Sequence, residues 1–132
     1  MSLARLRVVH IMRPMRQNVT GKWRLVEMEQ WDQEFVDLVE PGFIAFQKNG
    51  RGEMRFGAVN LDLDWEMGEN DRIEFSFEGF DEGDEVMGRG WARLRDGKLL
   101  GQIKFHQGDK SGFTAESWKE FPNRIRGSTN GP

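Results

Sequence analysis

His106 and Asp109 are the residues of this chain best suited to move a proton, and they lie three positions apart in a polar segment. A histidine titrates near neutral pH and a carboxylate can orient its ring, so the pair could act as general acid and base. Glu27 or Glu78 could do the same if either carboxylate points into a cavity. However, the chain has no nucleophile elbow, paired-carboxylate pattern or phosphate loop, and Gly88-Arg89-Gly90 is not a dinucleotide fingerprint. An enzyme is therefore our third hypothesis, and no residue is assigned a catalytic role.

The acidic segment Asp81-Glu82-Gly83-Asp84-Glu85 offers oxygen ligands of the kind that Ca²⁺ and Mg²⁺ prefer. Its spacing does not match the EF-hand loop. His106 and Asp109 could add a nitrogen and an oxygen ligand, but a single histidine makes a poor transition-metal site. We interpret the segment as a solvated turn, and we expect neither a bound metal nor a cofactor.

The composition predicts one small β-rich domain. A chain of 132 residues is large enough for one core and too short for two ordinary cores. Its 16 Gly, 10 Phe and 5 Trp, with only 4 Pro, favour many short strands joined by tight turns. A net charge of −3 leads us to expect no nucleic-acid or membrane partner. Without cysteine there is no disulfide or thiolate nucleophile, and we expect a cytoplasmic protein.

The two ends of the chain differ in composition from the middle. Residues 1–20 carry four arginines around the short apolar run Val8–Met12, which is too short and too interrupted for a secretory signal or a membrane span. We expect a loosely ordered arm over 1–20, a barrel domain over 21–121 and a flexible polar tail over 122–132.

Alternation of apolar and polar residues predicts strands through most of the middle region. The clearest cases are Leu61–Met67 and Ile73–Glu78, where every second residue is apolar. The fold class that we expect is all-β, an eight-stranded antiparallel up-and-down meander barrel. The eight strands are expected near 21–29, 43–48, 51–57, 59–67, 72–79, 86–95, 98–106 and 111–119.

One segment follows the period of a helix instead. Trp31, Phe35, Leu38 and Val39 recur at helical spacing, with Asp32 as a candidate N-cap. The sequence thus predicts one short helix between the first two strands, with these four side chains facing the barrel.

Turn lengths predict which end of the barrel carries function. Asn49-Gly50, Gly68–Asp71 and Asp96-Gly97 indicate compact hairpins, whereas 79–85 and 106–110 look like longer loops. Because successive turns of a meander alternate between its two ends, the longer loops, the helix and the turn at Gly57 should share one end. We expect this end to be the working face.

Gly21-Lys22-Trp23, at the start of the first strand, resembles the Gly-x-Trp opening of lipocalins and their calycin relatives. Without the signal peptide and disulfides usual in secreted lipocalins, the chain is more similar to small intracellular bacterial calycin-like proteins of unknown function. The resemblance implies the barrel fold and a central ligand cavity, and it supplies no catalytic residues.

The barrel interior can be predicted from strand parity. Small or apolar residues fill the inward positions of one strand, namely Val86, Gly88, Gly90, Ala92 and Leu94. Gly101 and Ala115 extend this wall, and aromatic side chains opposite it either leave a cavity or fill the space. We expect burial of Trp23, Leu63, Trp65, Ile73, Phe75, Phe77, Ile103, Phe105 and Phe113.

The leading hypothesis is a non-enzymatic barrel that binds a small, partly apolar ligand in its interior. The ligand-binding residues would be Trp23, Leu25, Trp31, Phe35, Trp65, Phe75, Phe77, Phe80, Gly88, Gly90, Phe105 and His106. The alternative is a protein-interaction module whose filled barrel presents the helix and the acidic segment to a partner. A ligand-sized apolar cavity would favour the first hypothesis, and a filled interior would favour the second.

Overall fold

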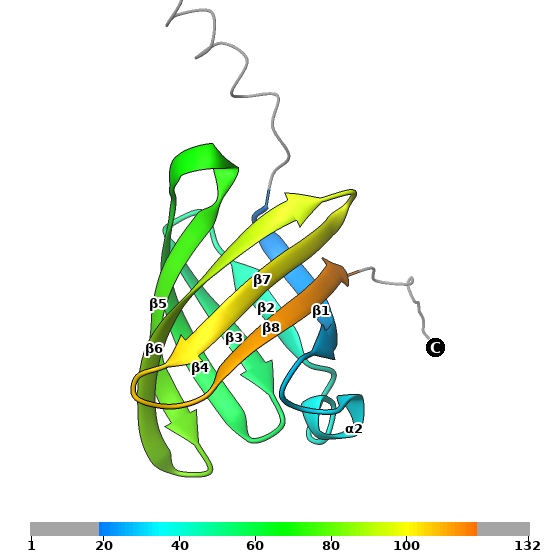
Figure 1. The fold of residues 1–132 in the computed structure, drawn as a ribbon, viewed down its shortest axis with the longest axis vertical. Coiled ribbons are helices and arrows are strands. Elements are labelled where there is room, and N and C mark those ends of the chain that lie inside the picture. Colours follow the sequence, from blue (N-terminus) through cyan, green and yellow to red (C-terminus); the bar gives the residue numbers. More distant parts are fainter. Residues whose placement is uncertain (1–18, 119–132) are drawn as a thin grey trace, which may run out of the picture.

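The computed structural model describes residues 19–118, so the predicted arm over 1–20, apart from its last two residues, and the predicted tail over 122–132 lie outside the described residues. Eight strands and one short helix make up this part of the chain (Figure 1). Their bounds are β1 Gly21–Met28, α2 Gln33–Val36, β2 Phe43–Phe46, β3 Arg51–Phe56, β4 Val59–Met67, β5 Ile73–Asp81, β6 Asp84–Arg95, β7 Lys98–Phe105 and β8 Lys110–Ser117. A 3₁₀ turn, Glu69–Asp71, joins β4 to β5.

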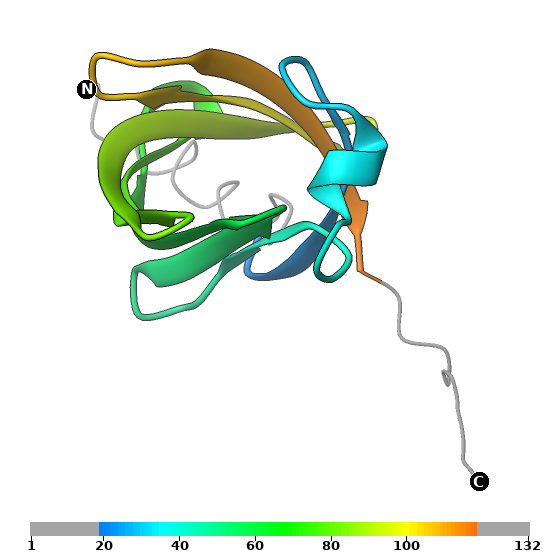
Figure 2. The same ribbon diagram turned by 90° about the horizontal axis from the view of Figure 1, so that it is seen from below.

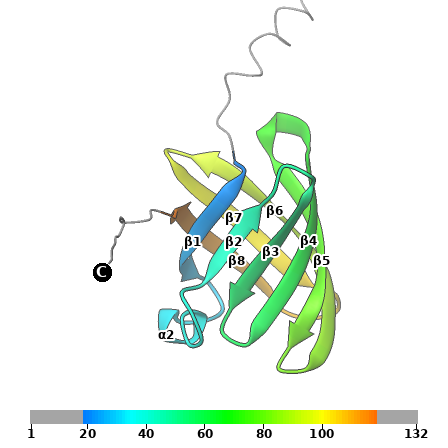
Figure 3. The same cartoon turned by 180° about the vertical axis from the view of Figure 1, so that it is seen from behind.

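The strands form a closed barrel in sequence order, and β8 pairs with β1 to complete it. Every neighbouring pair is antiparallel, as the rear view shows (Figure 3). The predicted fold class, an all-β meander barrel of eight strands with a short helix after the first, is therefore confirmed. Closure pairs strands all around the sheet and so limits the free edges at which sheets aggregate.

The turns lie at the two ends of the barrel as the meander requires. In Figure 1 the helix, the β3–β4 turn, the β5–β6 turn and the β7–β8 turn lie at the lower end. The turns after β2, β4 and β6 lie at the upper end. The prediction that the acidic segment and the His106 segment share one end is confirmed.

The prediction of a long loop over 79–85 is wrong. β5 continues to Asp81 and β6 begins at Asp84, so only Glu82 and Gly83 form the turn. Both have positive φ, of 54° and 91°, which is the conformation that two-residue hairpins require. The acidic residues resembled a solvated loop, but most of them are strand residues on a hairpin.

The helix is shorter than its periodicity predicts. Asp32 is the N-cap, as expected, and its side chain accepts a hydrogen bond from the Phe35 N–H. The helix ends at Val36, which is fully buried, while Leu38 and Val39 are 64% and 71% exposed. Placing these two residues on the packed stripe was therefore wrong. Viewed from below, the helix lies at one side of the rim (Figure 2).

Asp37 explains why the helix stops where it does. Its carboxylate accepts hydrogen bonds of 2.7 and 3.0 Å from the Arg24 guanidinium on β1, and others from the Gln33 amide and the Gly42 N–H. These contacts pull the chain out of helical geometry and fasten it to β1. The bonds from Arg24, the strongest cause, hold the pKa of the Asp37 carboxyl well below its usual range, although desolvation acts the other way.

Candidate functional site

The small residues predicted for one wall of the barrel lie directly beneath phenyl rings. Register pairs Phe75 with Gly90, Phe77 with Gly88 and Gly101 with Phe113. A Cβ atom built on any of the three glycines would lie only 2.5 Å from the ring tip of the paired phenylalanine. The rings thus occupy the space that the missing side chains leave.

Burial across the rest of the interior agrees with this packing. The core side chains in the middle of the barrel expose at most 7% of their surface, and a ligand-sized cavity there would leave room for water against them. The buried set includes Trp23, Leu25, Ile44, Phe46, Met54, Phe56, Leu61, Leu63, Ile73, Phe75, Phe77, Leu99, Ile103 and Phe113. Along the described strands, the barrel is filled by its own side chains.

Two predicted core residues are less buried than expected. Trp65 and Phe105 are only half-buried because they lie near opposite ends of the barrel. The Trp65 indole N–H donates hydrogen bonds to the carbonyls of Gln47 and Arg51. Trp23, in the Gly-x-Trp segment, is buried and donates to the Val19 carbonyl.

Aromatic side chains close the helix end of the barrel. The Trp31 ring lies 5.0 Å from the ring of Phe56, 6.3 Å from that of Phe105 and 6.4 Å from that of Phe35. Phe105 in turn meets Phe77 of the core at 5.2 Å. Trp31 therefore joins the helix segment to the strand preceding His106 and forms part of the packed end.

Phe80 and His106 do not join the interior set. Both are exposed, and Phe80 lies on the outer face of β5. Of the twelve residues predicted to line a ligand site, the structure gathers ten in or around the barrel interior and leaves these two outside.

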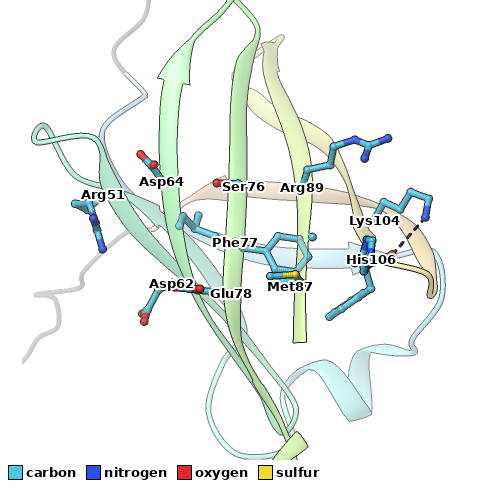
Figure 4. Close-up of a pocket in the computed structure, with 13 residues that line it drawn as sticks. Arg51, Asp62, Asp64, Ser76, Phe77, Glu78, Met87, Arg89, Lys104 and His106 are labelled. Atoms are coloured by element: carbon cyan, nitrogen blue, oxygen red, sulfur yellow. Dashed lines mark hydrogen bonds between the residues drawn. The ribbon is translucent and has the colours of Figure 1, made fainter. Parts of the chain in front are cut away.

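The outer face of β4–β7 carries a groove of about 470 Å³. It runs across the strands between two rows of outward side chains, because register aligns Asp62, Glu78 and Met87 in one row and Asp64, Ser76, Arg89 and Lys104 in the next. In Figure 4 the acidic side chains of β4 extend to one side, and Arg89 and Lys104 extend to the other. His106 lines the basic side.

The groove is also lined by Arg51, which lies opposite Asp64 across β3 and β4, but in the part of the chain that the structure describes the charged side chains of the groove are not joined in ion pairs. Asp62 and Glu78 lie directly opposite each other across β4 and β5, where like charges destabilise a sheet. Within residues 19–118, Asp62, Asp64, Glu78 and Arg89 form no ion pair, although other exposed side chains such as Arg72 and Glu74 do.

A second groove, of about 450 Å³, lies nearer the end of the β5–β6 hairpin. We call residues 78–87 the acidic hairpin end. Phe80 and Met87 are 50% and 53% exposed there, and Glu78, Glu85 and Asp62 of β4 line the same groove. The segment contains five carboxylates and no lysine or arginine. Strand parity places Phe80 and Met87 on the outer face, and this is the signal by which the sequence marks them.

In the described part of the chain, no group of three or more His, Asp and Glu side chains is arranged to hold a metal ion, and Asp81–Glu85 is a hairpin turn with its flanking strands. No helix between residues 19 and 118 is long and apolar enough to cross a membrane.

Comparison of the chain with protein-family models, curated proteins and solved structures finds no match. The class is therefore defined by the fold alone. It is a closed eight-stranded antiparallel meander barrel, an arrangement consistent with the calycin fold.

Proposed function

We propose that this protein is a non-enzymatic interaction module, in which a filled barrel presents the acidic hairpin end to a partner. The observation that carries the proposal is the packed interior, where Phe75, Phe77 and Phe113 fill the space above three glycines. A filled barrel has no room for a ligand but makes a rigid scaffold. Function then falls to the surface, where exposed Phe80 and Met87 lie among unpaired carboxylates.

The proposal is tested by asking whether the barrel admits a small apolar molecule. Native mass spectrometry of gently purified protein should show the bare chain, and NMR titration with benzene should leave the core methyl signals unmoved. Phe77→Ala is the matched positive control, because it opens an apolar hole that benzene can enter. A co-purified small molecule, or benzene entering the wild type, would overturn the proposal in favour of an interior ligand.

A second candidate, a small apolar ligand held at the helix end, is favoured by the half-buried rings of Trp31, Phe35 and Phe105. These rings could part to admit a ligand if the helix moves. In that case Trp31→Ala should speed ligand release while leaving the fold nearly intact, because an element at the rim contributes less to global stability than the core. Unchanged release rates in Trp31→Ala would exclude this candidate.

A further inference from the structure

The β5–β6 hairpin extends beyond its neighbour on one side, which leaves a free strand edge in an otherwise closed barrel. β6 begins at Asp84, but its strand register with β7 begins only at Gly88, opposite Phe105, and the last hydrogen bond on this side is made by Met87. On the other side, β5 is paired with β4 as far as Asp81. In Figure 1 the hairpin projects below the β7–β8 turn.

The backbone groups at this edge can be assigned from the register. The Met87 carbonyl accepts a hydrogen bond from the His106 N–H at 2.7 Å, so the backbone polar groups of Met87 point toward β7. In an antiparallel strand the residue two positions away points the same way. Glu85 therefore directs its N–H and C=O to the open side, where β7 has no residue opposite it.

We infer that this edge, Asp84–Val86, accepts an extended segment of a partner protein as an added strand, and that this segment alternates cationic and apolar residues. The inference rests on the proposed function and names the chemistry of its partner. Strand addition supplies main-chain hydrogen bonds, and alternate side chains supply specificity.

The alternation follows from the two faces of β6. Glu85 and Met87 face outward beside Phe80 and Glu78, so the outward side chains of an added strand meet carboxylates and are best cationic. Val86 faces inward and packs against the core, so an added inward side chain is best apolar. Residues 78–87 hold five carboxylates and no lysine or arginine, and this local charge also favours a cationic partner.

A second copy of this chain fits the edge poorly. Two-fold pairing of the same edge would bring Glu85 of one copy directly opposite Glu85 of the other, and like charges opposed across strands are destabilising. We therefore assign the edge to a different, cationic protein.

The probe for the test is the peptide Lys-Val-Lys-Val-Lys-Val-Lys, blocked at both ends and titrated into the full-length protein at low salt. We expect ¹⁵N NMR shifts centred on residues 84–87, slower hydrogen exchange of the Glu85 amide, and affinity that falls as salt is added. Shifts spread over all acidic surfaces without protection of the Glu85 amide would overturn the inference.

Variants separate main-chain pairing from charge. Glu85→Pro removes the free N–H at a position where no existing ladder bond depends on it, and should weaken peptide binding by about tenfold or more. Glu85→Gln keeps the N–H and should weaken binding only a few-fold. Glu40→Gln, at an exposed position outside the strands, is the matched charge control and should bind as the wild type does.

A peptide whose backbone is N-methylated along one edge is the second probe, for the case in which Glu85→Pro fails to fold. This peptide carries the same charge as the unmodified one but cannot donate hydrogen bonds along that edge. Equal binding of the methylated and unmodified peptides would overturn strand addition. Dimerisation of the wild type that Glu85→Pro abolishes would also overturn the inference and assign the edge to a second copy. Neither result would show that the barrel holds a ligand, so the proposed function as an interaction module would stand.

Discussion

The inner and outer faces of the β5–β6 hairpin differ in packing and in charge. On the inner face, Phe75 and Phe77 lie over Gly90 and Gly88 so closely that a single added carbon would collide with a ring. On the outer face, Phe80 and Met87 are half exposed and Glu78 faces Asp62 without a compensating cation. The inner face is packed for stability, whereas the outer face gives up some stability, which agrees with the binding role that we propose for it.

The largest expected effect is the difference in stability loss between truncating a phenylalanine on the inner face and truncating one on the outer face. Phe75→Ala should lower the free energy of unfolding by about 3–5 kcal/mol, because it removes a buried ring and leaves a cavity. Phe80→Ala, on the outer face of the same strand, is the matched control and should change it by no more than about 0.5 kcal/mol. Urea denaturation of both variants measures the difference, and equal losses would contradict the assignment of the two faces.

The second prediction tests the close fit of ring and glycine. Gly90→Ala should destabilise the fold by about 1–3 kcal/mol, because its Cβ would lie 2.5 Å from the Phe75 ring and 2.6 Å from the Gln102 carbonyl oxygen. Gly112→Ala is the control, since its Cβ would meet nothing closer than 3.6 Å. If thermal melts show the same shift for both, the interior is looser than the structure indicates.

The third prediction contrasts a paired carboxylate with the unpaired ones. Asp37→Asn should lower the free energy of unfolding by about 1 kcal/mol at pH 7. Solvent screening of the partly exposed Arg24–Asp37 pair limits this value. Because the folded-state pKa of Asp37 is lowered, its contribution is fully present above the unfolded pKa of about 4 and is lost as pH falls below it. The difference in the free energy of unfolding between variant and wild type, measured by denaturation curves, should therefore narrow between about pH 4 and pH 2. A gap that is constant over this range would show that the pair contributes nothing.

The smallest expected effect is a gain in stability. Glu78→Lys should raise the free energy of unfolding by about 0.2–1 kcal/mol, because it replaces a like-charge pair with an attractive one opposite Asp62. Glu40→Lys makes the same change in net charge elsewhere and serves as the control. Destabilisation by Glu78→Lys in chemical denaturation would mean that the carboxylate has a structural role on this face.

The fold could be predicted because alternation is a local signal. Leu61, Leu63 and Trp65, or Ile73, Phe75 and Phe77, show which face of each strand is inward, and the turns between strands determine a meander. Parity also placed Gly88, Gly90 and Ala92 on the inner face, where the register confirms them. The helix length was missed because Leu38 and Val39 keep the helical period after Asp37 has ended the helix with contacts to β1.

What the sequence determined by itself was the barrel, its strand order and the end at which the acidic and His106 segments meet, since each depends on neighbours in the chain. Tertiary structure decided whether glycines opposite phenylalanines leave a cavity or a packed core, because that depends on how far each ring reaches across the barrel. It also decided that Asp81–Glu85 belongs mainly to a hairpin extending past β7, since a free edge exists only relative to the length of the neighbouring strand. The acidic residues were visible from the start, and the unpaired backbone beside them was not.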